Sequence, residues 1–507
     1  MQELKELVLF IDKYLGKKAD ILNTKPLAKL GQLYEGILNG NWNSDEEAAE
    51  RLYPDEGLSS SAYRKLKMTL KQRLIDQLFT IDLKQADSTD RQKAYYVCYK
   101  DWAAAKLLLA KNARLAGIEL CQKVLKEAIK YEFSDLCRDA TATLRIHYGT
   151  MEGDARKFQQ YNELYKNYSY LCQQEELAEE YYTELTINYV NTRSLQAETY
   201  EKAKHYYQQL ENNLKEFDSY RLHLYSRLIQ MTIYSSVNDY ENTLKVCQEA
   251  IAFFEKKEYT ANAPLQIFYY QILVDLITLK EFEKGIHIAQ KLEAYIEVGT
   301  FNWFKYQELF FLLSAHTQRF EQAFNVFQRV FSNKKFQLLP GHVAETWKIF
   351  EAYLYYLVKT QAIKEVDEHS MKFKLGKFLN EIPLFSKDKS GMNIAILTIQ
   401  ILFSLLEKEH GTAAEQIEGI KKYCSRHLAK GHTRRSYYFI KMLLQIPQNY
   451  FNQQAVLRKS EPILEKLRAI PLELSNQSLE VEVIPYEILW DLALHTLDNR
   501  IREGYTA

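Results

Sequence analysis

A four-residue pattern recurs at nearly constant spacing through the middle of the chain. It reads aromatic residue, glutamate, any residue, small residue. Four copies fit it: Tyr200 to Ala203, Tyr240 to Thr243, Phe282 to Gly285 and Phe320 to Ala323. Consecutive copies are roughly 40 residues apart, a period typical of stacked structural repeats. This periodicity restricts the possible folds more than any other feature of the sequence.

The pattern predicts stacked helical hairpins. Each copy follows a segment of helical periodicity and a short polar link, and precedes another such segment. A single amphipathic helix cannot bury its apolar face alone, whereas stacked pairs bury a continuous core. The small residue would let two helices approach closely, and the aromatic would fill the gap between hairpins. We therefore predict an all-α fold, an α-solenoid; chance recurrence in a chain rich in Tyr and Glu is the alternative.

The composition favours long helices. Only 17 glycines and 9 prolines occur in 507 residues, and these are the residues that break helices. The 47% of hydrophobic residues are enough for a large buried core. Alternating patterns typical of strands are nearly absent, and the one short alternating stretch, 479–484, is expected to be a linker or the start of a helix.

The repeat resembles the start of the second helix in the tetratricopeptide repeat family. The resemblance extends to bulky Tyr207 and Phe327, and to small Ala250. The period is nearer 40 than the family's 34 residues. The family's glycine in the first helix is replaced by larger residues such as Met231 and Leu273, and its closing proline is missing. The resemblance implies a helical-repeat fold, and no ligand contact is carried over from the family.

The chain divides into three predicted parts. Residues 1–88 form a helical head, and residues 89–445 form the repeat array, which is clearest over 180–335. Weaker copies of the repeat centre on Leu115 and Phe158. Residues 446–507, where four of the nine prolines fall, form capping helices.

The head contains a candidate helix-turn-helix. Ser44 would cap a short acidic helix, a turn follows, and residues 59–61 cap a longer helix without acids between Glu56 and Asp76. The basic residues of this candidate DNA-contact helix are Arg64, Lys65, Lys67, Lys71 and Arg73. A basic helix after a short helix and turn can enter the major groove. The alternatives are that it packs into the head with solvated lysines, or contacts a protein.

A second basic segment lies near the C-terminus. No Asp or Glu occurs from Gly419 to Ser460, and aromatic residues alternate with the basic ones. The candidate partner-binding residues are Lys421, Lys422, Arg426, Lys430, Arg434, Arg435 and Lys441. They could neutralise phosphates of a nucleic acid, meet an acidic protein surface, or form a solvated helix face.

An aromatic segment offers candidate groove residues. Trp303, Phe304 and Tyr306 would either pack between hairpins or line a groove and anchor a peptide, since rigid aromatics are good binding hot spots.

The sequence lacks the motifs of common catalytic sites. No phosphate-binding glycine loop, dinucleotide fingerprint or nucleophile elbow is present. The 66 basic and 66 acidic residues balance, so overall charge does not indicate nucleic acid binding. We expect no enzymatic activity, cofactor or metal. The six scattered cysteines and the absence of a signal peptide or a span of ~20 apolar residues predict a cytoplasmic protein without membrane contact.

These observations predict a non-catalytic interaction scaffold or adaptor. It would hold a protein partner on a superhelical face, on the basic flank, or on both. The alternative is a nucleic-acid-associated regulator, and bacterial regulators with a small head before tetratricopeptide-like repeats resemble this layout. An accessory subunit of a larger bacterial assembly is a third hypothesis. The oligomeric state does not follow from the sequence.

Overall fold

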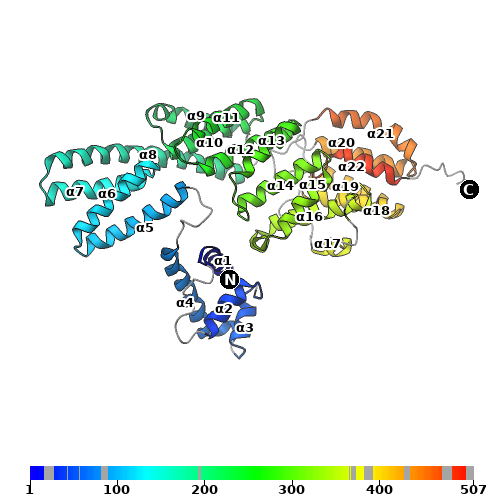
Figure 1. Ribbon diagram of the computed structural model, residues 1–507. Coiled ribbons are helices and arrows are strands. Elements are labelled where there is room, and N and C mark those ends of the chain that lie inside the picture. The colour runs from blue at the N-terminus through cyan, green and yellow to red at the C-terminus, as the bar shows by residue number, and fades with distance from the viewer. Residues whose placement is uncertain are drawn as a thin grey trace, which may run out of the picture. The chain divides into compact units, whose positions relative to one another are not determined.

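The computed structural model consists of helices joined by turns and loops in the part of the chain that it describes (Figure 1). It describes residues 1–15, 28–42, 44–55, 57–81, 90–191, 196–364, 366, 371, 373–381, 392–427, 434–470 and 482–497. No β-strand lies among these residues. The chain forms two compact units, of which unit 1 comprises Met1–Val190, His205–Ser226 and Lys256–Ala261. Unit 2 comprises the remainder.

Unit 1 begins with the helical head and continues into a group of longer helices. Its helices are α1 (Gln2–Leu15), α2 (Ala28–Leu38), α3 (Asp45–Leu52), α4 (Ser61–Gln77), α5 (Asp90–Ala110), α6 (Arg114–Lys130), α7 (Ser134–Ile146) and α8 (Ala155–Asn191), with parts of α9 (Gln196–Glu216) and α10 (Tyr220–Ser235). Helix α6 packs on both α5 and α7. Helix α8 has 37 residues and is far longer than its neighbours.

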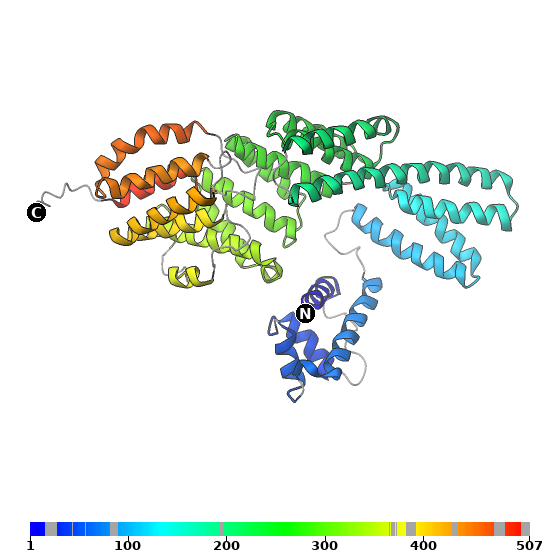
Figure 2. The ribbon, with the colours of Figure 1, turned by 180° about the vertical axis from the view of Figure 1, so that it is seen from behind.

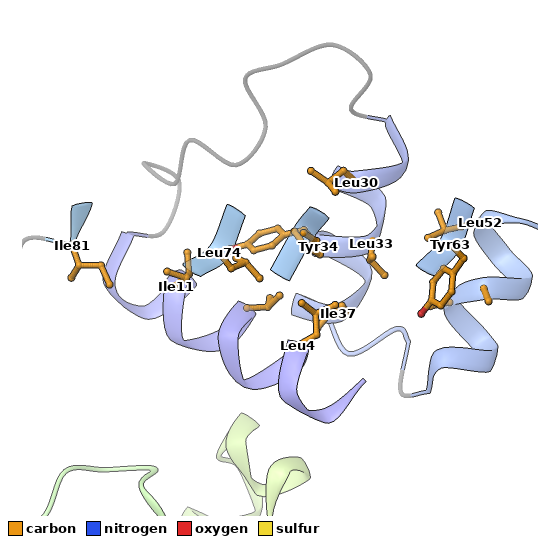
Figure 3. Close-up of a cluster of buried hydrophobic side chains, with 14 residues drawn as sticks. Leu4, Ile11, Leu30, Leu33, Tyr34, Ile37, Leu52, Tyr63, Leu74 and Ile81 are labelled. Carbon is orange, nitrogen blue, oxygen red and sulfur yellow. The ribbon is translucent and has the colours of Figure 1, made fainter. Parts of the chain in front are cut away.

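The head has its own hydrophobic core (Figure 3). Helices α1, α2 and α4 pack on one another around side chains such as Leu4, Leu33, Ile37 and Leu74. As predicted, the side chain of Ser44 caps α3 by accepting a hydrogen bond from the backbone of Glu47. Ser60 caps α4 in the same way.

Unit 2 is built from consecutive helices that pack in pairs. It contains α11 (Tyr240–Glu255), α12 (Asn262–Thr278), α13 (Phe282–Glu293), α14 (Phe301–His316), α15 (Phe320–Phe331), α16 (Gly341–Lys359), α17 (Leu375–Glu381), α18 (Met392–Leu406), α19 (His410–His427), α20 (Arg434–Gln448), α21 (Gln453–Arg468) and α22 (Tyr486–Thr496). The packing of α11 on α12, α12 on α13 and α14 on α15 is consistent with a helical repeat.

Three of the four repeat copies mark the first residue of a helix. Helices α11, α13 and α15 begin at Tyr240, Phe282 and Phe320, whereas Tyr200 lies within the first turns of α9. The small residues Ala203, Thr243, Gly285 and Ala323 are all buried. A Cβ added to Gly285 would lie 3.3 Å from a methyl group of Leu313 on α14, so the small residue does permit close helix packing.

Several turns between paired helices share one geometry, and the residue with the positive φ is not glycine. The residue two positions before the second helix has a positive φ, as at Asn112 (66°), Lys280 (61°) and Gln318 (59°). The backbone N–H of the following residue donates a hydrogen bond to the carbonyl oxygen five residues earlier. For example, Arg319 N lies 2.8 Å from Ser314 O. This is the Schellman arrangement, in which glycine is usual. Polar residues in this position explain how so many turns coexist with so few glycines.

The side chains of the weak repeat copies are more exposed than those of the clear copies. Leu115 lies in the first turn of α6, which begins at Arg114, and is 89% exposed. Phe158, the other weak copy, is also exposed. The predicted boundary between residues 445 and 446 falls inside α20, which packs on α21 and α22.

Candidate functional site

An open groove runs along the C-terminal half of α8 in unit 1. Its volume is about 630 Å³. It is lined by Glu176, Glu179, Glu180, Thr183, Glu184 and Ile187 of α8 and by Arg221 of α10. We call it the α8 groove. Its lining therefore includes four carboxylates and one guanidinium.

The spacing of the glutamates makes the groove acidic along its length. Glu176, Glu180 and Glu184 follow one another at intervals of four residues, so they lie on one face of α8. Like charges at this spacing destabilise a helix by about 0.2–0.5 kcal/mol per pair. Helix stability therefore does not account for them.

Three of the groove's four glutamates have partners within the protein, Glu184 among them. Arg221 forms an ion pair with Glu179, and Nη1 of Arg138 lies 3.6 Å from Oε1 of Glu176. The Glu176 side chain is nevertheless 62% exposed, and Glu180 is exposed too. Solvent-exposed ion pairs contribute little free energy, so an incoming cation can displace them.

A buried carboxylate, Glu175, connects α8 to Arg221 of the groove. Glu175 is fully buried and accepts hydrogen bonds from the hydroxyls of Ser134, at 2.9 Å, and Ser219. Its other oxygen lies 3.7 Å from Nη1 of Arg221. Burial raises the pKa of Glu175, while the two hydroxyls and Arg221 oppose the shift. These contacts fix α10 against α8, so the groove walls are held in place.

Tyrosines flank the acidic residues. The rings of Tyr181 and Tyr206 are stacked, with centroids 4.0 Å apart and planes within 3°. The hydroxyl of Tyr206 donates a hydrogen bond to Glu184, which ties α9 to the groove. Carboxylates beside tyrosine rings form a suitable surface for Lys and Arg side chains, which can make ion pairs and cation–π contacts together.

The candidate groove aromatics do not line a groove. Trp303, Phe304 and Tyr306 are at most 1% exposed, and all three lie in the core of unit 2. The prediction that they anchor a peptide is therefore wrong. Helix α14 is buried on nearly every side, because α12, α13 and α15 pack around it.

The basic segment does not form one surface. Arg435 is 5% exposed, and its guanidinium donates to Glu482, to Glu487 at 2.7 Å and to the carbonyl oxygens of Leu467 and Ile470. The prediction that Arg435 faces a partner is thus wrong, because an acid 47 residues away covers it. Burial would lower the pKa of Arg435, but the two carboxylates outweigh it and hold the guanidinium charged.

Other residues of this segment differ in exposure. Lys421 is exposed and pairs with Glu418 at 3.3 Å, and exposed Lys441 lies over the ring of Tyr437. Lys422 is also exposed. Lys430 lies outside the described residues, as do the side chains of Arg426 and Arg434.

The basic helix of the head is partly neutralised. Helix α4 follows α3 and a turn, as the helix-turn-helix prediction requires. Lys67 forms an ion pair with Asp45 at 2.8 Å, and Lys71 forms one with Glu3. Arg73 is half-buried. Arg64 and Lys65 at the start of the helix are exposed, and Arg64 donates a hydrogen bond to the carbonyl oxygen of Ser59.

Sequence reasoning missed the α8 groove, although a signal for it exists. The run from Glu175 to Glu184 places five glutamates within ten residues of a helix. Their spacing shows one acidic face, but only the fold places Arg221 opposite that face.

Comparison with protein-family models, with curated proteins and with solved structures finds no match. Within the part of the chain that the structure describes, no helix combines the length and the apolar character needed to cross a membrane.

Proposed function

We propose that this protein is a non-catalytic scaffold that holds a positively charged segment of a partner protein in the α8 groove. The observation that carries the proposal is an open groove whose four glutamates outnumber the two arginines that pair with them, Arg221 and Arg138, on a helix whose own stability the glutamates reduce. We further propose that the paired helices form an α-solenoid similar to tetratricopeptide repeats, in which such surfaces commonly bind peptides.

The partner's chemistry follows from the lining of the groove. Lysine or arginine would pair with Glu176, Glu180 and Glu184, and aliphatic stems would pack on Ile187, which is 53% exposed. The groove is open and its glutamates follow one face of α8, so we expect an extended segment or a helix with basic residues on one face. Arginine can also stack on the tyrosines beside the groove.

Fluorescence anisotropy with a labelled Lys/Arg-rich peptide tests the proposal. We expect binding at about 0.1 M salt and at least about tenfold weaker binding at about 1 M salt, where charges are screened. Glu176→Lys with Glu180→Lys should weaken binding at least about tenfold. The control is Lys166→Glu, because Lys166 is exposed on the same helix outside the groove. Binding that is absent, or unaffected by the double substitution, would refute the proposal.

A nucleic-acid-associated regulator remains a second candidate. It is supported by the exposure of Arg64 and Lys65 at the start of α4, directly after α3 and a turn. Binding of a mixed DNA and RNA pool should then fall steeply with salt, and Arg64→Glu with Lys65→Glu should abolish it. Absence of binding at low salt would eliminate this candidate.

A further inference from the structure

Two helix connections lie side by side at one end of unit 1, where α5 turns into α6 and α7 turns into α8 (Figures 1 and 2). They are in contact, because Nη1 of Arg114 lies 3.1 Å from Sδ of Met151. We call residues 107–116 and 145–158 the hairpin tip. The second connection includes a π-helical turn, His147–Met151, a feature often found at functional positions.

The hairpin tip exposes several large apolar side chains. Leu115 is 89% exposed and Met151 57%, and Leu107 and Ile146 are exposed as well. Single exposed apolar residues are ordinary, but several on adjoining turns mark an interaction surface. The α8 groove offers a matching apolar residue, Ile187, among its acids.

The hairpin tip is also basic. Its exposed cations are Lys111, Arg114, Arg156 and Lys157, whereas Arg145 is half-buried and donates a hydrogen bond to Asn162. Its two acids are engaged locally, Glu152 with His147 at 2.9 Å and Asp154 with the backbone N–H of Lys157. Three of the cations lie in the first turns of α6 and α8, where the helix dipole disfavours positive charge. Local helix stability does not explain them.

The hairpin tip and the α8 groove are thus complementary in charge and in apolar character. We infer that the hairpin tip of one copy of this chain docks in the α8 groove of a second copy. This inference rests on the proposed function and names the partner that supplies the basic segment.

The contact has to be intermolecular. Arg156 and Glu180 belong to one continuous helix, so they are held about 36 Å apart along its axis. The tip and groove of one unit therefore cannot meet. Because the two surfaces differ, the contact is head-to-tail, and each bound copy leaves a further tip and groove available. Association should extend to open chains or close into a ring.

Sedimentation velocity over a range of protein concentrations tests the inference. At about 0.1 M salt the average mass should rise with concentration. At about 1 M salt, where the Debye length falls from about 10 Å to about 3 Å, the protein should sediment as a monomer. Protein that stays monomeric at low salt but still binds the basic peptide overturns self-association and leaves the proposed function standing.

Charge reversal gives a sharper test. A tip variant, Lys111→Glu with Arg156→Glu, and a groove variant, Glu176→Lys with Glu180→Lys, should each be monomeric. Mixed together they should associate again, because an acidic tip then meets a basic groove and a basic tip meets an acidic groove. Lys166→Glu is the matched control and should associate like the parent protein. Circular dichroism verifies that each variant is folded.

Two outcomes would overturn the inference. In one, the tip and groove variants associate as the parent does. In the other, the parent is monomeric and co-sediments with phosphatidylcholine–phosphatidylserine vesicles, and the tip variant does not. The hairpin tip would then be a lipid contact.

Discussion

The Nζ of Lys257 lies 3.0 Å from the carboxylate of Glu132, a residue 125 positions earlier in the chain. The same carboxylate accepts hydrogen bonds from the hydroxyl of Tyr259, at 2.9 Å, and from the backbone N–H of Tyr220, at 2.8 Å. One side chain in the turn between α6 and α7 thus holds two distant segments of unit 1. The guanidinium of Arg91 stacks on Tyr220 beside it.

We predict that Glu132→Gln destabilises the protein by about 2–3 kcal/mol. The Lys257 side chain is only 8% exposed and would keep one carboxylate partner, Asp218 at 3.1 Å. The loss comes from the neutralised ion pair with Lys257 and from the weaker hydrogen bonds that a neutral amide accepts from Tyr259 and Tyr220. Urea denaturation followed by circular dichroism measures the change. The control is Glu163→Gln, since Glu163 is exposed on α8 and bonds only Gln159 nearby. An equal effect of the two substitutions would contradict this role.

Asp275 should make the protein less stable as the pH rises. It is 1% exposed within α12, and burial raises its pKa from 3.8 to about 7, while a hydrogen bond from Gln271 opposes the shift. Between these two values the folded state holds a proton that the unfolded state has lost. The free energy of unfolding should therefore fall by about 2–4 kcal/mol from pH 4 to pH 7 through this group.

The substitution Asp275→Asn isolates that contribution. The variant should be more stable than the parent at pH 8, because an amide has no charge to bury. Its stability should also change less between pH 4 and pH 8. Thermal unfolding at several pH values provides the measurement, and parallel pH profiles for both proteins would refute the assignment.

Glycine should stabilise the turn that precedes α15. Gln318 is exposed and has a φ of 59°, a conformation that is unfavourable for residues with a Cβ. We expect Gln318→Gly to raise the free energy of unfolding by about 0.5–1 kcal/mol. The same change at Gln328, exposed within α15, should lower it by about 1 kcal/mol. Effects of the same sign at both positions would show that φ is not the cause.

Substitution of Arg435 should unfold part of the protein rather than weaken a surface contact. Arg435→Glu would place a third acid beside buried Glu482 and half-buried Glu487 and remove the side-chain donor to the carbonyl oxygens of Leu467 and Ile470. We expect a loss of about 3–5 kcal/mol. The matched surface change, Lys441→Glu, should cost under about 0.5 kcal/mol. Limited proteolysis and chemical denaturation distinguish the two.

The sequence alone determined the helical class and the starts of α11, α13 and α15. These features are local, since a helix start depends on residues within one or two turns of it. The aromatic-glutamate pattern therefore located Tyr240, Phe282 and Phe320 correctly. The weak copies at Leu115 and Phe158 also lie in the first turns of helices, α6 and α8, although both side chains are exposed.

The tertiary structure decided which residues face solvent. Arg435 and Lys441 lie in the same basic run of the sequence. Arg435 is buried against Glu482, which is 47 residues away in the chain, whereas Lys441 is exposed. The α8 groove likewise needs Arg221 and Tyr206, which come from helices other than α8. Whether a charged side chain is exposed or buried depends on long-range packing. The periodicity of a single helix does not predict that packing.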